Sequence, residues 1–335
     1  MNTPMALARR YGLQVVALIV LTVVLVSTTP GFRGEAAIYA SFEGFILVGI
    51  VAAGLAVTMI AGEMDMSVGS MAALSGVIAI QLGGAGLVPA ILGATAIGLA
   101  IGLLQGYLIG VMRINSMVLT VGTLILLRGM TSVVAHDKPV VLNNFEITDP
   151  LLQQWGVFSP GSITAIVVLL LIGVFLTRTR WGREIYAIGG ARAEATAAGV
   201  PVRRSLIVSF GLSGGCAALA GALSSLKGAS ATPDGFGSVL LTGVAAVLIG
   251  GISLYGGRGT IVNVFLGVGT IAILSAGMSA KGSQAFVTEL YTGLLLLVIV
   301  AIDFALGLWW RRRRLDELHR RVGIERDEPA TPVAA

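Results

Sequence analysis

The sequence predicts an all-α membrane protein, a polytopic helix bundle of about ten transmembrane helices. Hydrophobic residues make up 56% of the 335 positions and charged residues only 12%, whereas soluble domains carry about 25% charged residues. Apolar stretches of about 20 residues, the length that crosses a bilayer as a helix, recur along the whole chain. Glycine is also frequent, with 46 residues, which lets helices approach closely inside a membrane.

Ten candidate spans follow one another along the chain. They cover residues 13–29, 38–61, 66–82, 86–110, 116–134, 161–177, 205–226, 237–251, 260–280 and 286–310. The third is short and flanked by Gly, and the eighth has only about 15 residues against the roughly 20 needed to span. Eight spans with two re-entrant segments therefore fit nearly as well. The first apolar stretch follows Arg9 and Arg10, an arrangement that is also found in export signal peptides. Because no soluble domain comes after it, we interpret it as an uncleaved first span.

The distribution of positive charge supports this order of spans. With the N-terminus inside, 17 of the 22 Lys and Arg residues fall on the cytoplasmic side, as the positive-inside rule requires. Both termini are then cytoplasmic and the number of spans is even. The predicted parts are a cytoplasmic N-terminus (1–12), a transmembrane domain (13–310) with an external loop (135–160) and a cytoplasmic loop (178–204), and a polar, disordered cytoplasmic tail (311–335).

Catalytic motifs are missing from the sequence. There is no Walker A pattern, and none of the three lysines follows a glycine. HExxH and GxSxG are absent as well, and the predicted topology puts His136 and His319 on opposite sides of the membrane. We therefore expect a protein that is not an enzyme and that holds neither a metal nor a cofactor.

The segment GEMDMSVGS (62–70) carries two carboxylates, Glu63 and Asp65, between two apolar spans. Its glycines break the helix, and Asp65 or Ser67 can cap the next one. A plain cytoplasmic turn would explain the segment. The alternative is a broken helix that faces a transport path, since an ionised group in mid-membrane costs about 3 kcal/mol and needs a reason. Glu63, Asp65 and Ser67 are therefore transport-path candidates.

Arg128 is a further transport-path candidate, about 12 residues into the fifth span. We expect a carboxylate partner, snorkelling to the outer interface, or a polar path around it, rather than lipid. The fourth span carries a ladder of glycines four residues apart, which places them on one helix face and predicts close packing against another helix. These glycines are Gly98, Gly102, Gly106 and Gly110.

The long internal loop contains a short segment that is helical by composition. Residues 192–198 are rich in Ala, Gly199 suits the position just after a helix, and Pro201 stops continuation. An ordinary basic loop that obeys topology is one interpretation, and a docking helix for a cytoplasmic partner is the other. A later segment, GGISLYGGRG (250–259), is similar in character to 62–70, which suggests a distant internal duplication.

Four motifs in this order resemble the permease subunits of bacterial ABC importers of the ribose, xylose, rhamnose and quorum-sensing furanose type. They are GEMDMSVGS (62–70), NSMVLTVGTLILLRGM (115–130), GREIYAIGGARAEATAAGV (182–200) and LIGGISLYGGRGT (248–260). The resemblance covers roughly residues 36–304. The chain departs from the family pattern at Glu63, Gln105, Met117 and Ala191, and the last change removes a natural N-cap of the loop helix.

The resemblance implies two permease chains, two cytoplasmic ATPase subunits that bind ATP, and an external solute-binding protein. It implies that a sugar or sugar-like solute crosses the inner membrane between the permeases by alternating access. The residues expected to couple to the ATPase are Arg192, Glu194, Ala195 and Gly199. The solute, and whether the second permease is identical, are left open. The alternative function is a proton-coupled secondary transporter, with Glu289 and Asp303 of the last span as its relay, although they lie about 21 Å apart along a helix.

Overall fold

The computed structural model describes residues 4–322, and its secondary structure there is almost entirely helical. The α-helices are α1 (Pro4–Thr28), α2 (Glu35–Gly44), α3 (Ile50–Ile60), α4 (Val68–Gln81), α5 (Leu87–Gly110), α6 (Ser116–Ala135), α7 (Asp149–Leu152), α8 (Pro160–Arg178), α9 (Arg180–Gly190), α10 (Arg192–Ala197), α11 (Val202–Lys227), α12 (Val239–Ile249), α13 (Ile261–Ala280) and α14 (Ala285–Val322). A π-helical turn, η1 (Phe45–Gly49), joins α2 to α3, and η2 (Leu82–Ala85) and η3 (Phe145–Thr148) are 3₁₀ turns.

Within the described range, nine helices are long and apolar enough to cross a membrane, which confirms the predicted polytopic bundle. They match nine of the ten predicted spans. The tenth, predicted at 237–251, is the apolar helix α12, whose 11 residues cover only about 16 Å of a hydrocarbon layer about 30 Å thick. The chain before α12 is irregular, so α12 is a half-length helix.

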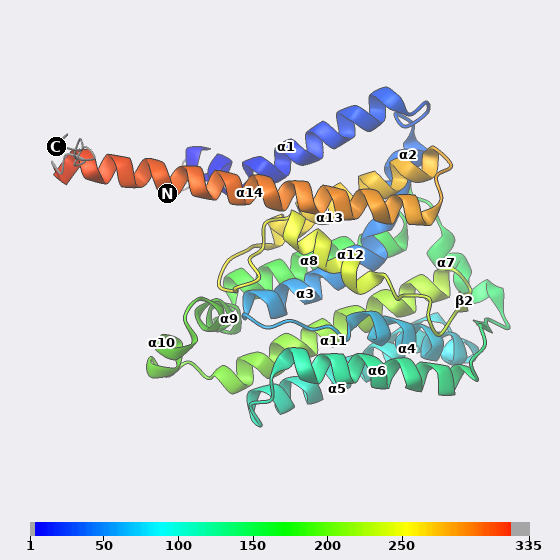
Figure 1. Ribbon diagram of the computed structural model, residues 1–335. Coiled ribbons are helices and arrows are strands. Elements are labelled where there is room, and N and C mark those ends of the chain that lie inside the picture. The colour runs from blue at the N-terminus through cyan, green and yellow to red at the C-terminus, as the bar shows by residue number, and fades with distance from the viewer. Residues whose placement is uncertain (1–3, 323–335) are drawn as a thin grey trace, which may run out of the picture.

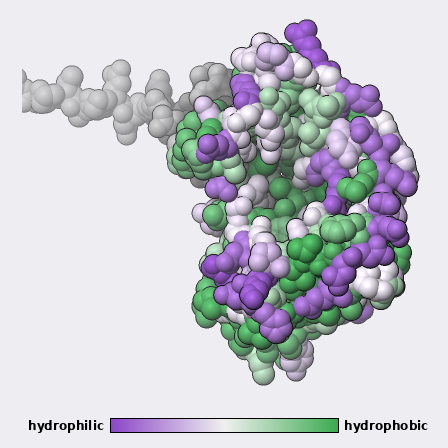
Figure 2. Space-filling view, turned by 90° about the vertical axis from the view of Figure 1, so that its right-hand side faces the viewer, coloured by the Kyte–Doolittle hydropathy of each residue, from purple (hydrophilic) through white to green (hydrophobic). Residues whose placement is uncertain are grey.

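The helices lie side by side and run between two ends of the bundle (Figure 1). Helices α9 and α10 lie at one end, where α1 also begins and α14 ends. The other end carries α7 and a small antiparallel ladder of β1 (Val140–Val141) and β2 (Ser230–Ala231). Figure 2 faces this second end and shows hydrophilic residues around a hollowed area with apolar residues in it.

The helix ends follow local signals in the sequence. Asn115 caps α6, because its side-chain oxygen accepts hydrogen bonds from the backbone N–H groups of Met117 and Val118. Ser159 and Ser162 form a capping box at the start of α8, and Pro160 occupies the first helical turn. Gly62, with a φ of 78°, ends the turn after α3 in a conformation that favours glycine.

The core is built around α3 and α11. Every residue of α3 is buried, and α11 packs along α3, α4 and α5. The predicted glycine ladder of α5 lies against α11: a Cβ at Gly106 would stand 2.5 Å from Cα of Ile207, and one at Gly110 would stand 2.9 Å from the carbonyl oxygen of Arg203. Two more ladder glycines, Gly98 and Gly102, likewise meet the backbone of α11. The ladder therefore brings two backbones into direct contact.

The last helix extends past the predicted span 286–310. The segment after residue 310 was expected to be a disordered tail, but α14 continues as a helix to Val322. Residues 311–322 contain neither Pro nor Gly, so no residue in this stretch interrupts the helix. The rest of the predicted tail, 323–335, lies outside the described residues.

Candidate functional site

Three glycine-containing segments, the end of α9 and two turns, meet at the end of the bundle that carries α9 and α10. The backbone N–H of Gly257 donates a hydrogen bond of 2.8 Å to the carbonyl oxygen of Ile60. A Cβ at Gly256 would stand 2.7 Å from Cα of Gly62, and a Cβ at Gly189 would collide with the Ile60 carbonyl. The segments 62–70, 182–200 and 248–260, far apart in the sequence, are thus in backbone contact, which side chains at these glycines would prevent.

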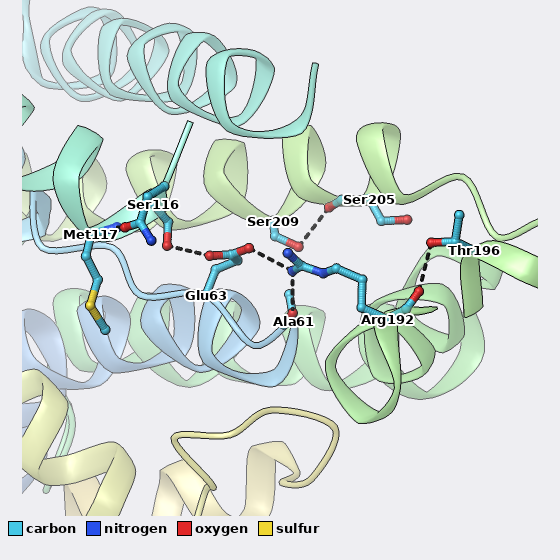
Figure 3. A network of polar contacts seen from close by, with 9 residues as sticks. Ala61, Glu63, Ser116, Met117, Arg192, Thr196, Ser205 and Ser209 are labelled. Carbon is cyan, nitrogen blue, oxygen red and sulfur yellow. Dashed lines mark hydrogen bonds and ion pairs between the residues drawn. The ribbon is translucent and has the colours of Figure 1, made fainter. Parts of the chain in front are cut away.

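Glu63 connects three elements at this junction (Figure 3). Its Oε1 lies 2.7 Å from a guanidinium nitrogen of Arg192, at the start of α10. Its Oε2 accepts a short hydrogen bond from the hydroxyl of Ser116, the first residue of α6. Arg192 also donates a hydrogen bond of 3.4 Å to the carbonyl oxygen of Ala61. Glu63, a transport-path candidate, and Arg192, an ATPase-coupling candidate, are therefore joined by an ion pair.

A cavity of about 860 Å³ opens beside this ion pair. It lies between α10, the start of α11 and the turn from α5 to α6. Four arginines line it, Arg113, Arg192, Arg203 and Arg204, whereas Glu63 is its acidic residue. This end of the bundle is therefore strongly basic, which agrees with the side that the positive-inside rule assigns to the cytoplasm.

Helix α9 is anchored to the bundle. Ile185 and Ile188 are buried, and the nearly buried Glu184 pairs with Arg180 at 2.8 Å and accepts a hydrogen bond from Ser205 of α11. The sequence analysis did not predict a separate helix here, although Ile185 and Ile188 are three residues apart, a spacing that places both on one face of an amphipathic helix. The arginines of this loop favoured its interpretation as an ordinary basic loop instead.

Helix α10 projects from that anchor. Of its six residues only Ala195 is buried, and Glu194 is exposed. Ala191 stands at its N-cap and makes no side-chain cap hydrogen bond. Gly199 has a φ of 79°, and the space around its missing Cβ is empty for at least 4 Å. The residues predicted to be helical, 192–198, thus form a short exposed helix that is closed by a left-handed glycine.

Asp65 and Ser67 have a different environment from Glu63. Asp65 is completely buried, and its carboxylate accepts hydrogen bonds from the hydroxyls of Ser67 at 2.6 Å and Ser213 at 2.7 Å. It also accepts the backbone N–H of Ser67, whose hydroxyl receives a hydrogen bond of 2.9 Å from Gln105. The carboxylate thus fixes the irregular segment before α4 to α11, and the hydroxyl of Ser67 links it to α5, so this segment is a break inside the bundle.

The second motif that resembles this break is placed differently. In the segment 250–259, Leu254 is 55% exposed and Tyr255 is 92% exposed. This segment is a surface turn between α12 and α13, because the polar network that buries Asp65 has no counterpart in its sequence. The similarity of the two motifs therefore does not extend to their packing.

Arg128 lies toward the opposite end of the bundle from Glu63. Its guanidinium forms an ion pair of 2.8 Å with Asp234, in the segment between β2 and α12. The sequence led us to expect a carboxylate partner or a polar path, but it did not single out Asp234. Glu289 is exposed near the start of α14, and the side chain of Asp303 lies outside the described residues.

Comparison with known proteins gives one consistent family. The family model of the branched-chain amino acid transport system permease component matches residues 38–302, most of the chain. The ribose import permease protein RbsC of Escherichia coli K12 is 32% identical over 75% of this chain and 80% of its own. The inner membrane ABC transporter permease protein YjfF of the same organism is 31% identical over 87% and 90%. The fructose import permease protein FrcC of Rhizobium meliloti is 32% identical over 77% and 74%. No solved structure matches significantly.

Proposed function

This chain belongs to the family of branched-chain amino acid transport system permease components, and on that premise we propose that it is the transmembrane permease subunit of an ATP-binding-cassette importer. The solute is a sugar or a sugar-like molecule, because the similar proteins include import permeases named for ribose, allose, fructose and L-arabinose. The chain acts in a cell membrane by alternating access. It hydrolyses no ATP and holds no cofactor of its own.

The proposed partners follow from the same premise. A cytoplasmic ATPase subunit binds at the end of the bundle that carries α9 and α10, which also puts both termini in the cytoplasm. A solute-binding protein delivers the solute at the opposite end, and a second permease chain, identical or paralogous, completes the transport path. The arginines around the 860 Å³ cavity support this orientation.

The observation that carries the proposal is the exposed helix α10 and its ion pair with Glu63. Six residues are too few for a stable isolated helix, so α10 depends on α9 on one side and, we propose, on a docking groove of the ATPase on the other. A movement of α10 is passed through Arg192 to Glu63, and from there to the irregular segment before α4 and to Ser116 of α6. The contact is thus a mechanical link between ATPase and transport path.

Substitutions in α10 test this link. Gly199→Val forces a β-branched residue into a left-handed conformation, whereas Gly199→Asn is the matched control, because Asn tolerates that conformation. Glu194→Arg reverses a charge on the exposed face. We expect Gly199→Val and Glu194→Arg to lose co-purification with the ATPase or to uncouple ATP hydrolysis from uptake, while Gly199→Asn keeps both.

Membrane insertion is measured in parallel, since each variant should reach the membrane at the wild-type level. If Gly199→Val and Glu194→Arg both assemble and transport normally, the coupling site lies elsewhere, and the exposed turn that contains Arg258 is the next surface to test.

A further inference from the structure

The ion pair between Arg128 and Asp234 is exposed beside α6, a helix that is long and apolar enough to cross a membrane. Arg128 lies seven residues before the end of α6, which is about 10 Å below the end of the helix. The side chains of Arg128 and Asp234 are nevertheless 64% and 71% exposed. A charged side chain near the bilayer centre costs about 2.5–3.5 kcal/mol on insertion scales. The pair is therefore accommodated best if it faces a water-filled space within the transporter.

A small cavity of about 150 Å³ lies at this ion pair. Its lining comes from the start of α4, from α6, and from the irregular segment before α12. Ser70, Arg128, Asp234 and Phe236 contribute its polar and aromatic side chains. A Cβ at Gly69 would stand 3.1 Å from the carbonyl oxygen of Phe236, so the two discontinuous helical segments are in close contact beside the cavity.

The chemistry of the lining favours an uncharged solute that is rich in hydroxyl groups. Arg128 and Asp234 together carry no net charge, so neither an anion nor a cation is preferred. Guanidinium N–H groups donate, the carboxylate accepts, and the hydroxyl of Ser70 does either. Phe236 offers an apolar aromatic side chain of the kind that packs against carbon-bound hydrogens. The cavity volume of about 150 Å³ is smaller than the roughly 300–1,000 Å³ of sites for drug-sized ligands. A cavity of this size suits a molecule with a single small ring.

We propose that this cavity is a solute subsite in the outer half of the transport path, and that it binds one monosaccharide-sized, uncharged, polyhydroxylated molecule. Arg128 donates hydrogen bonds to adjacent hydroxyls, Asp234 accepts them, and Phe236 covers an apolar face of the ring. This inference rests on the proposed function, since it names the contacts through which the permease receives its solute.

Transport kinetics in proteoliposomes test the subsite. The permease is reconstituted with its ATPase and binding protein, and D-ribose, D-allose, D-fructose and L-arabinose serve as probes. Losing one charged hydrogen bond should raise the KM for uptake about tenfold, so Asp234→Asn and Phe236→Ala should each show an increase of that order. Co-purification with the ATPase should not change. Asp137→Asn and Phe286→Ala, outside the cavity, are the matched controls and should keep the wild-type KM.

A charge exchange separates solute contact from a structural role. The double variant Arg128→Asp with Asp234→Arg preserves the ion pair, so it should fold and assemble, but it moves the donors and the acceptor and should keep a raised KM. A wild-type KM in this double variant, or in both Asp234→Asn and Phe236→Ala, would overturn the subsite while leaving the permease function intact. ATP-dependent uptake of a charged or apolar solute by the wild-type complex, and of none of the four sugars, would instead reject the proposed sugar transport, and the subsite with it.

Discussion

At the scale of single residues, Glu63 has the most informative environment. Its carboxylate is 12% exposed and lies between Arg192, which is 46% exposed, and the hydroxyl of Ser116. Partly exposed ion pairs contribute about 1 kcal/mol or less to stability. The value of this pair therefore lies in joining α10 to the segment before α4 and to α6, rather than in holding the fold together.

The Glu63 ion pair can be tested by exchanging its charges. Glu63→Gln removes the charge with little change in shape, so we expect a loss of unfolding free energy below about 1 kcal/mol, but uptake that falls well below the wild-type rate at the same protein level. Glu63→Arg combined with Arg192→Glu restores an ion pair and should recover part of the uptake. Thermal unfolding in detergent and uptake in cells are the two measurements. Wild-type uptake by Glu63→Gln would show that the pair transmits nothing.

The roles of individual residues were only partly predictable from the sequence. The sequence indicated that Glu63 and Asp65 are unusual between two apolar spans and so are candidates for a role in transport. It also indicated that Arg128 has a carboxylate partner, snorkels to the interface or faces a polar path. It could not pair Glu63 with Arg192 across 129 positions or Arg128 with Asp234 across 106, because such pairs depend on how the turns pack. Asp65 and Glu63, two residues apart, belong to separate networks, which spacing alone does not reveal.

At the scale of elements, the close approach of α5 and α11 is the main packing feature. A Cβ at Gly102 would collide with the carbonyl oxygen of Phe210, and one at Gly106 would stand 2.5 Å from Cα of Ile207. These contacts involve backbone atoms, which cannot rotate away as a side chain can. The two helices would have to separate to admit even one methyl group.

Alanine substitutions measure this packing. Gly102→Ala should lower the unfolding free energy by about 1–3 kcal/mol through overpacking, seen as a lower yield of monodisperse protein and a lower midpoint of thermal unfolding. Gly122→Ala, on α6, is the control, because nothing lies within 4 Å of its missing Cβ. Equal stability of the two variants would mean that α5 and α11 do not pack along the glycine ladder.

Elements with a strong apolar signal were predicted well from the sequence, and the others were not. The nine long helices follow from hydropathy, because length and apolar composition decide whether a helix can span a membrane. Helix α12 was one of the two weakest predicted spans, with about 15 residues and a re-entrant segment as the alternative, and its helix has 11 residues. Helix α9 was missed because Arg180, Arg183 and Glu184 made the segment resemble an ordinary basic loop. Its burial depends on the bundle surface beneath it.

At the scale of the whole molecule, the arrangement of the helices supports the proposed topology. Helix α1 begins and α14 ends at the end of the bundle that carries α9 and α10 (Figure 1). The chain therefore crosses the bundle an even number of times if α12 and the irregular segment before it together complete one crossing. The excess of arginine near α10 agrees with a cytoplasmic location for this end.

Reporter fusions test the topology directly. A reporter that is active only in the cytoplasm should work when fused at Ala330 and fail when inserted within 135–160, whereas a reporter that is active only outside should show the reverse. The expectation follows from the positive-inside distribution of Lys and Arg. An exported reporter that is active at Ala330 would invert the topology and would move α10 to the side opposite the ATPase.

The central claim is that this chain moves a solute with energy that a separate ATPase supplies. It is tested most directly by uptake into proteoliposomes that contain the permease, its ATPase and its binding protein, loaded either with ATP or with an imposed proton gradient and no ATP. We predict uptake that requires ATP and stops when the phosphate-binding loop of the ATPase is inactivated. The uptake rate should not depend on the proton gradient. Uptake driven by the proton gradient in liposomes that contain this chain alone would contradict the account and would establish a secondary transporter instead.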